Sequence, residues 1–421
     1  METKSPIPVG WRFDLLDNLA KRGSGHTPDK SKSSYWNGGI KWVSLADSSQ
    51  LDNGYIYATD KEISEEGLQN SSAVLHPAET VVLSRDAGVG KSAVLATPMA
   101  VSQHFMAWQC DNQHTLHSWF LYYWLQMMKP EFERQAVGST IKTIGLPYFK
   151  KLKILAPSYT EQTKIAKILS TWDKAIATTE RLLANSQQQK QALAQNLLTG
   201  RKRHRKFSGT WKSYCLSDLF ERITKKNTEG NTNVVTISAQ HGLIRQDEFF
   251  KKTVASTTLE GYYLLSHGQF AYNKSYSNGY PMGAIKRLNR YGKGVVTTLY
   301  ICFAVRDESN CCPVFFEKFF DAGLLNEGLA QVAHEGGRAH GLLNVKPADF
   351  FSLKVQVPSL PEQQKIAQVL STADAEIANL QAQLDKLKRE KKALMQQLLT
   401  GKRRVRLDDE EEDVAPIRRV G

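Results

Sequence analysis

Two short stretches of the sequence resemble parts of known ligand-binding motifs. Residues 86–92 read DAGVGKS, like the end of the phosphate-binding loop G-x-x-x-x-G-K-[ST], but Arg85 occupies the position of the first glycine. Cys110, His114 and His117 have spacings that a metal could use, yet no fourth ligand stands nearby in the sequence. We therefore predict a turn between two strands at 86–92, and core and surface residues rather than metal ligands at the other three positions.

Other catalytic signatures are incomplete or absent. His334 and Glu335 begin like a metalloprotease motif, but no second histidine follows at the required spacing. Glu390 and Lys392 have the Glu-x-Lys spacing of some nuclease sites but lie inside a predicted long helix. The sequence has no Gly-x-Ser-x-Gly elbow and no Asn-Pro-Pro-Tyr or Asp-Pro-Pro-Tyr tetrapeptide of amino-methyltransferases. We expect no catalytic residue, metal or cofactor on this chain, which leaves binding as its function.

Basic and small polar residues gather in glycine-punctuated turns. Side chains of these kinds reach the phosphate oxygens and base edges of DNA. In the first half of the chain the candidates are Lys21, Arg22, His26, Lys30, Lys32, Arg85, Lys91, Thr140 and Lys142. In the second half they are Lys225, Lys226, Lys274, Tyr276, Asn278, Arg287, Arg290, Arg338 and His340. Any one of them could be an ordinary solvated turn residue, so the prediction depends on the set.

The overall charge favours a polyanionic partner. The chain of 421 residues has a formal net charge of +13 at pH 7. Six acids stand together at 408–413, and because each contributes −1, the rest of the chain carries +19. Cationic surfaces bind DNA through counterion release, with an affinity that falls steeply with salt. A basic surface without a partner is the alternative interpretation.

Composition bears on the compartment. The longest apolar run, residues 119–125, is far shorter than the roughly 20 residues that span a bilayer. The five cysteines include no C-x-x-C pair, and the start METKSPIPVGW has no apolar signal-peptide core. We therefore expect a cytoplasmic chain without disulfides and without a membrane partner.

One long stretch occurs twice and must position the turns described above. Residues 158–200 and 359–401 align without a gap at a constant offset of 201 residues, and both end in Leu-Leu-Thr-Gly. Each copy begins with Ser-x-x-Glu, a predicted capping box, and carries an apolar heptad pattern. Each copy therefore predicts one uninterrupted helix of roughly 60 Å, and the apolar stripes predict that the two helices pair antiparallel. A purely structural coiled coil is the simplest interpretation of the periodicity.

The chain divides into globules that alternate with these helices. Residues 1–156 and 207–357 are the globules, 157–200 and 358–401 the long helices, 201–206 a basic linker, and 402–421 a charged tail expected to be disordered. We predict strands at 41–45, 81–84, 93–96, 152–155, 234–238, 269–273, 300–305 and 353–357, and helices at 116–128 and 313–320. The globules match at their edges but not in their interiors. The predicted fold class is α+β: two mixed α/β globules separated by two long antiparallel coiled-coil helices, with a pseudo-twofold internal repeat.

Several runs of residues carry a resemblance to a known family. They are the Glu-Gln-x-Lys-Ile-Ala helix starts at 161–166 and 362–367, the Leu-Leu-Thr-Gly helix ends, and the runs at 10–11, 25–28, 35–42, 84–91 and 138–142. Over nearly its whole length the chain resembles the DNA-specificity (S) subunit of type I restriction–modification systems. The second globule lacks counterparts of the runs at 25–28 and 35–42, so its assignment depends on Trp211, residues 337–345 and the strand that enters the second long helix.

The resemblance implies a division of labour. In that family two target-recognition domains each read one half of a split DNA sequence, and the helices set the spacer and dock two methyltransferase (M) subunits. Restriction/translocase (R) subunits join for cleavage. S-adenosylmethionine, ATP and Mg are expected on those partner subunits. By this resemblance the docking residues on the helices are Ile165, Leu169, Trp172, Ile176, Lys190, Ile366, Leu370, Ile377 and Lys391; for the two lysines, control of helix register is the structural alternative.

Two other classes of function remain open at this point. One is a DNA-acting nuclease or transferase with an unrecognised site, which activity of the purified chain alone would support. The other is a coiled-coil scaffold that binds only protein, which the absence of DNA binding would support.

Overall fold

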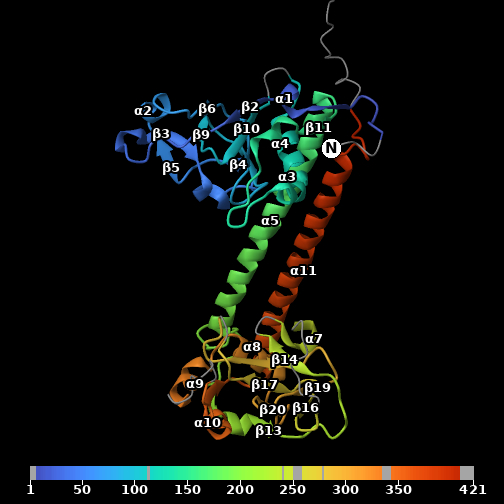
Figure 1. Ribbon diagram of the computed structural model, residues 1–421. Coiled ribbons are helices and arrows are strands. Elements are labelled where there is room, and N and C mark those ends of the chain that lie inside the picture. Colours follow the sequence, from blue (N-terminus) through green and yellow to red (C-terminus); the bar gives the residue numbers. More distant parts are fainter. Residues whose placement is uncertain are drawn as a thin grey trace, which may run out of the picture. The chain divides into compact units, whose positions relative to one another are not determined.

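Two compact units, each with one globule, make up the chain. The computed structural model describes residues 6–110, 114–238, 241–249, 258–276, 279–333 and 343–407. Unit 1 is Met1–Glu180 with Gln383–Gly421, and unit 2 is Arg181–Ala382. The division crosses both long helices, so each unit contains one globule and a part of each helix (Figure 1). Among the described residues no helix is long and apolar enough to cross a membrane.

Short strands build the described part of the first globule. Its sheets have the strand orders β2-β10-β7-β8-β4, β5-β3-β9-β6 and β1-β11. The strands are β1 Arg12–Leu15, β2 Lys21–Ser24, β3 Trp36–Val43, β4 Tyr55–Ile56, β5 Lys61–Ile63, β6 Leu75–His76, β7 Val81–Ser84, β8 Ser92–Leu95, β9 Met99–Val101, β10 Phe105–Gln109 and β11 Lys153–Ala156. The helices are α1 Leu16–Leu19, α2 Glu65–Gln69, α3 Ser118–Gln135 and α4 Leu146–Lys150, with 3-10 turns at Ser33–Tyr35 and Leu45–Ser49. The strands predicted at 81–84, 93–96 and 152–155 are confirmed to within one residue, whereas the one predicted at 41–45 begins earlier, in β3.

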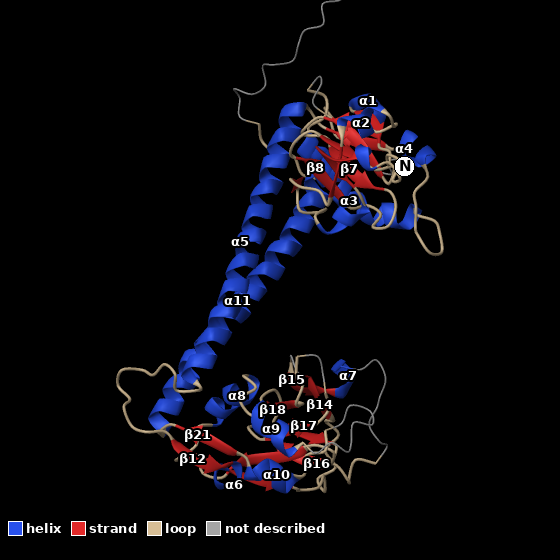
Figure 2. Cartoon of the chain, turned by 90° about the vertical axis from the view of Figure 1, so that its left-hand side faces the viewer, coloured by secondary structure: helices blue, strands red, loops and turns tan. Residues whose placement is uncertain are grey.

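Helix α3 packs against β7 and β8 and supplies much of the first core (Figure 2). The sequence predicts a helix that stops before Pro130, and this is wrong: α3 continues through it to Gln135. Pro130 lacks an N–H and clashes with the preceding turn, which costs about 3 kcal/mol. Phe132, one turn from the end, is fully buried, and such burial contributes about 1.5–3 kcal/mol. The core contact of Phe132 therefore offsets much of the proline cost.

The second globule has a different set of sheets. In its described part the strand orders are β13-β20-β17-β18, β14-β15, β16-β19 and β12-β21. The strands are β12 Lys212–Cys215, β13 Phe220–Ile223, β14 Val235–Ser238, β15 Gly242–Arg245, β16 Tyr263–Ser266, β17 Phe270–Asn273, β18 Ala284–Arg287, β19 Lys293–Val296, β20 Ile301–Val305 and β21 Lys354–Val357. The helices are α6 Leu216–Leu219, α7 Gln246–Phe249, α8 Pro313–Asp321, α9 Asn326–Val332 and α10 Pro347–Ser352. The strands predicted here and the helix at 313–320 are confirmed to within one residue. In the core, Phe220, Phe270, Phe303 and Phe316 are fully buried.

The two globules share an edge frame, as the sequence predicts. In each, the first strand pairs antiparallel with the strand that leads into the long helix, β1 with β11 and β12 with β21. The Leu16 N–H donates to the Leu152 carbonyl, and the Leu216 N–H donates to the Leu353 carbonyl, both at 2.8 Å. The larger sheets, by contrast, differ in strand order. A common frame therefore surrounds unlike interiors.

The long helices are α5, Tyr159–Leu197, and α11, Leu360–Leu398, each of 39 residues. Gly200 and Gly401 follow their ends with φ of 70° and 71°. This left-handed conformation is the one in which glycine commonly ends a helix. Within each unit the two helix segments lie side by side and run antiparallel (Figures 1 and 2), which confirms the predicted pairing.

Salt bridges at equivalent positions cross the helix pair. In unit 1, Lys391 Nζ binds Asp173 Oδ1, and the Tyr123 hydroxyl donates to Asp173 Oδ2 at 2.7 Å. In unit 2, Lys190 Nζ binds Asp374 Oδ1, and a second lysine from α8 lies 2.7 Å from Asp374 Oδ2. Both seam lysines therefore pair within the chain and fix the register of the helices, which is the structural alternative that the sequence left open.

In the predicted capping boxes, the interaction of the glutamate carboxylate with the backbone is wrong. The Ser158 hydroxyl accepts from the Glu161 N–H at 3.3 Å, as in a capping box. The carboxylates, however, bind arginines: Arg404 holds Glu161 through two bonds of 2.7 Å, and Arg203 holds Glu362 through bonds of 2.8 and 2.6 Å. A bidentate guanidinium is a stronger partner than a single backbone N–H. Each Arg follows a Leu-Leu-Thr-Gly end, so the end of one helix holds the start of the other.

Candidate nucleic-acid interface

A cleft of about 760 Å³ opens in the first globule. The residues that line it include Thr27, Lys30, Trp36, Asn37, Trp42, Lys61, Gln103 and His104. Ammonium groups bind phosphates, amide and imidazole groups hydrogen-bond base edges, and aromatic rings stack on bases. The lining therefore has the chemistry that nucleic-acid recognition requires.

One wall of the cleft is a loop that follows β2 and packs tightly on β9. A Cβ on Gly25 would lie 1.7 Å from the Val101 carbonyl oxygen, so only glycine permits this approach. The Trp42 indole N–H donates to the His26 carbonyl at 3.0 Å and fixes the next residue of the loop. Trp36 meets Trp42 edge-on, with ring centroids 5.2 Å apart. The runs at 25–28 and 35–42 thus build this wall together.

The turn between β9 and β10 brings Gln103 and His104 to the cleft. His104 Nδ1 lies 2.7 Å from Asp86 Oδ2, and Asp86 is 9% exposed. The other Asp86 oxygen, Oδ1, has no hydrogen bond among the described residues. Arg85 Nε lies 3.8 Å from it and likewise has no hydrogen bond within the described part of the chain. Because a carboxylate only accepts, the His104 Nδ1 carries the hydrogen, which leaves Nε2 for an outside partner.

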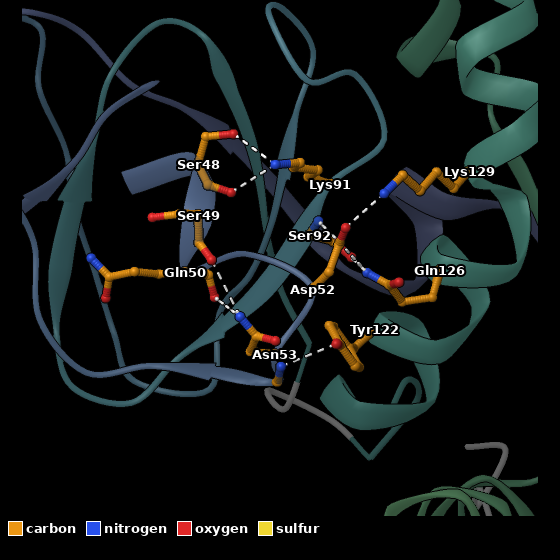
Figure 3. A network of polar contacts seen from close by, with 11 residues as sticks. Ser48, Ser49, Gln50, Asp52, Asn53, Lys91, Ser92, Tyr122, Gln126 and Lys129 are labelled. Atoms are coloured by element: carbon orange, nitrogen blue, oxygen red, sulfur yellow. Dashed lines mark hydrogen bonds and ion pairs between the residues drawn. The ribbon is translucent and has the colours of Figure 1, made fainter. Parts of the chain in front are cut away.

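A strained turn joins β7 to β8 and carries the acid that contacts His104. Ala87, Gly88 and Gly90 have positive φ values of 39°, 114° and 84°. Lys91 Nζ donates to the carbonyl and hydroxyl oxygens of Ser48 at 2.9 and 3.0 Å (Figure 3). The turn predicted at 86–92 is confirmed. Lys91, which the sequence predicts to bind DNA, also holds the turn through these bonds within the globule.

A second network ties this region to α3. Asp52 accepts hydrogen bonds from the Ser92 N–H at 3.0 Å, from Gln126 Nε2 at 2.6 Å and from Lys129 Nζ at 2.6 Å (Figure 3). Gln126 and Lys129 both come from α3, and Ser92 begins β8. The strand that follows the turn is therefore held to the core helix.

The loop 137–143 lies beside the same turn. Val137 and Thr143 exchange backbone hydrogen bonds of 3.0 and 2.9 Å, and Thr143 also pairs with Asp86 in an isolated bridge. The loop leaves Thr140 and Lys142 exposed. Two residues predicted to bind DNA are thus brought near the acid that contacts His104, although they are more than fifty residues from it in the sequence.

Comparison with known proteins identifies the family. The family model described as the type I restriction modification DNA specificity domain matches the chain twice, at residues 8–185 and 208–389. The chain belongs to this family. The first match covers the first globule and continues into α5, and the second covers the second globule and continues into α11.

Curated relatives carry names from the same family. The type I restriction enzyme MjaIX specificity subunit of Methanocaldococcus jannaschii is 27% identical over 172 residues, which are 40% of this chain and 39% of that protein. The type I restriction enzyme EcoR124I/EcoR124II specificity subunit of Escherichia coli is 27% identical over 172 residues, 39% of this chain and 41% of that protein. The matched stretch thus spans about two fifths of each relative.

Solved structures show the same fold over nearly the whole chain. The type I restriction–modification S subunit from M. genitalium has a TM-score of 0.56 at 15% identity, covering 95% of this chain and 98% of that chain. The HsdS subunit from Thermoanaerobacter tengcongensis has a TM-score of 0.53 at 15% identity, covering 95% and 99%. The predicted family and fold class are both confirmed.

The other predicted DNA-binding residues of the first specificity domain differ in their contacts within the chain. Lys30 lines the cleft. Arg22 Nε lies 3.2 Å from Asp17, and Lys32 Nζ donates to the Tyr35 hydroxyl at 2.9 Å, a bond that raises the pKa of Lys32. The side chains of Lys21, on β2, and His26, in the loop after it, are exposed. The cleft therefore gathers only part of the predicted set.

In the second globule several predicted cations have partners inside the chain. Lys225 Nζ lies 2.7 Å from the Glu229 carboxylate, and the hydrogen bonds from Lys225 and Lys293 lower the pKa of Glu229 to about 2. Arg287, only 16% exposed, donates to the Gly268 carbonyl at 3.1 Å. A DNA phosphate would have to compete with these contacts.

The remaining predicted residues of the second globule differ in their contacts and exposure. Lys226 and Lys274 donate to backbone carbonyls at 2.8 and 3.4 Å, and burial lowers the pKa of Lys274. Arg290 lies 3.5 Å from Glu248, and Tyr276 is 63% exposed. The predicted residues that lie outside the described part of the chain are Asn278, Arg338 and His340.

The predicted docking residues divide by burial. Four of them belong to the cores of the chain's own globules: Ile165, Leu169, Ile366 and Leu370. Trp172, Ile176 and Ile377 are partly exposed, and Lys190 and Lys391 form the seam salt bridges. Of the predicted apolar docking residues, these three are therefore the ones whose side chains keep some exposed surface.

Sequence reasoning missed several polar residues of the cleft, among them Asn37, Lys61, Gln103 and His104. Asn37 stands in a run that carried the family resemblance, and its Asn-Gly-Gly turn was a usable signal. Gln103 and His104 form a short link between two buried strands, with no repeat, glycine or charge cluster to mark them.

Proposed function

We propose that the chain is the specificity subunit of a type I restriction–modification complex. Each globule binds one half of an asymmetric bipartite sequence in double-stranded DNA. The observation that carries the proposal is the double match: two specificity domains in one chain, each continuing into a long helix. The unlike sheets of the two globules support unlike half-sites.

The helices act as the spacer in this proposal. Each has 39 residues and so a length of roughly 60 Å, which exceeds one DNA turn of about 34 Å. The repeated salt bridges of Asp173 and Asp374 support a fixed register. A stiff pair in fixed register gives the complex a defined gap between half-sites.

Catalysis belongs to partners in this proposal. Two methyltransferase subunits dock on the helices, with Trp172, Ile176 and Ile377 among the contacts, and carry S-adenosylmethionine. Restriction/translocase subunits supply the sites for ATP and Mg. Support comes from the names of the relatives, which are specificity subunits of restriction enzymes.

Sequencing of methylated bases tests the proposal. The chain is expressed with its methyltransferase subunit in a host without other methylation systems, and a split motif is expected. Exchange of residues 1–156 for another such domain changes only one half of the motif. Insertion of a heptad-compatible segment after Thr179 changes only the gap.

Three outcomes contradict the proposal. A domain exchange that alters both half-sites would break the link between one globule and one half. Methylation or cleavage by the purified chain alone would support the DNA-acting enzyme. Failure to shift DNA at low salt, even with the methyltransferase present, would support the protein-binding scaffold.

A further inference from the structure

The cleft of the first globule presents hydrogen-bond donors next to one another. The Thr27 hydroxyl donates to Gln103 Oε1, so the amide nitrogen of Gln103 remains as the free end. Gln103 itself is exposed, and His104 is partly exposed beside it. Lys30 and Lys61 add two ammonium groups to the same lining. Asp60 is the one carboxylate among the lining residues, so donors prevail.

Asp86 gives His104 a fixed orientation. Its carboxylate binds Nδ1 at 2.7 Å, and its second oxygen has no hydrogen bond among the described residues. A buried, half-satisfied carboxylate costs stability, so a role in orienting another group explains it better than stability does. In the doubly protonated ring both nitrogens carry a hydrogen, so Nε2 donates while Nδ1 keeps its bond to Asp86.

We propose that Gln103 and a doubly protonated His104 read a guanine in the half-site bound by the first globule. Guanine presents two acceptors, O6 and N7, on its major-groove edge, and it is the base that paired donors select. Adenine presents a donor beside N7, and cytosine presents a donor, so both would oppose the free ends of Gln103 and His104. The inference rests on the proposed function, because it assumes that this globule binds DNA.

The sharpest variant is Gln103→Glu. The Thr27 hydroxyl can still donate to one carboxylate oxygen, so the side chain keeps its position while its free end changes from donor to acceptor. Acidic side chains accept from the cytosine amino group. At one position of one half-motif, we therefore expect the preference to change from guanine to cytosine by roughly 5- to 150-fold. Gln69→Glu, on the exposed helix α2, is the matched charge control and leaves the motif unchanged.

His104→Ala and Asp86→Asn test the second donor. His104→Ala relaxes the choice of base at this or the adjoining position and leaves the other half-motif intact. In Asp86→Asn the amide oxygen can still accept from Nδ1, but the negative charge beside the ring is lost. We expect weaker discrimination with an unchanged melting temperature, a combination that a purely structural role of Asp86 would not produce.

The experiment uses the complete complex and separates two failures. Base preference is read from methylome sequencing and from binding to a panel of duplexes with each base at each position. If the wild-type complex methylates a bipartite motif and Gln103→Glu and His104→Ala leave every position unchanged, the guanine-reading inference is overturned and the proposed function stands. Equal weakening on all duplexes also overturns it, since that shows phosphate contact alone. If the wild-type complex methylates no bipartite motif, the proposed function itself fails.

Discussion

Removal of Arg404 should destabilise unit 1, because it leaves Glu161 buried without its cation. The Glu161 side chain is 1% exposed, and both of its oxygens bind the Arg404 guanidinium at 2.7 Å. Arg404 Nη1 also donates to the Val9 carbonyl at 2.7 Å. The hydrogen bond to Glu161 raises the pKa of Arg404 above its ordinary value, which agrees with a favourable pair.

The expected magnitude follows from burial. Breaking a buried ion pair by removal of one partner costs about 3–5 kcal/mol. Arg404 is 46% exposed, so water can reach Glu161 once the guanidinium is gone, and the lower end of about 3 kcal/mol applies. For a unit of this size each kcal/mol lowers the melting temperature by about 2–4 °C. Arg404→Met, which retains an apolar stem, should therefore lower it by about 6–12 °C.

Thermal unfolding followed by tryptophan fluorescence measures the effect. Seven of the eight tryptophans lie in residues 1–180, so the signal reports unit 1. Lys402→Met, two residues away on the same exposed segment, is the matched control and should change stability by less than about 0.5 kcal/mol. Arg203→Met removes the equivalent cation from Glu362 in unit 2 and should leave most of this signal unchanged.

A double substitution decides whether the buried charge is the cause. Glu161→Gln in the Arg404→Met background replaces the orphaned carboxylate by a neutral amide, so most of the lost stability should return. If Arg404→Met is no worse than Lys402→Met, or if Glu161→Gln gives no recovery, then burial of an unpaired charge is not what the contact prevents.

Two further predictions concern the seam and the cleft. Burial pushes the pKa of Asp374 up, but the hydrogen bonds from Lys190 and Lys318 outweigh it and hold the pKa below 3.8. A carboxyl group with a depressed pKa stabilises the fold above its unfolded pKa, and this contribution is lost as the pH falls through the folded pKa. Asp374→Asn should therefore lower the urea midpoint at pH 7, and its effect should shrink as the pH falls below 3.8 and vanish below the folded pKa. Gly25→Ala places a Cβ 1.7 Å from the Val101 carbonyl oxygen, so it should displace the wall of the cleft. We expect a lower melting temperature and loss of DNA binding by the complex. The control Gly145→Ala meets only an ordinary contact of 3.5 Å and should change neither the melting temperature nor DNA binding.

The sequence predicted the features that depend on local pattern. Long helices follow from the repeat at 201 residues, and the strands of both globules follow from short apolar runs between turns. These signals are local because helix periodicity and turn chemistry involve neighbours in the chain. Helix α3 is an exception, since the burial of Phe132 overrode the local effect of Pro130.

Partner choice could not be predicted, because it depends on residues far apart in the sequence. Ser158 and Glu161 have the right spacing for a capping box, but Arg404 takes the carboxylate from 243 residues away. Lys91 is a residue of the type that contacts phosphates, yet its ammonium group donates to Ser48, 43 residues earlier in the chain. A basic residue in a turn therefore shows only that a cation is present. Whether it is free to bind DNA is decided by the tertiary fold.

The seam shows how a repeated frame can accept unlike globules. Asp173 and Asp374 each bind a lysine of the opposite helix, and that pair is supplied by the repeat itself. The third partner comes from the globule and differs: a Tyr123 hydroxyl in unit 1 and a Lys318 ammonium in unit 2. Each globule thus completes the helix contact with its own chemistry. A foreign globule that preserves the frame but brings no donor to the aspartate would leave one carboxylate oxygen unsatisfied, so a domain exchange that retains stability must replace that donor as well as the edge strands.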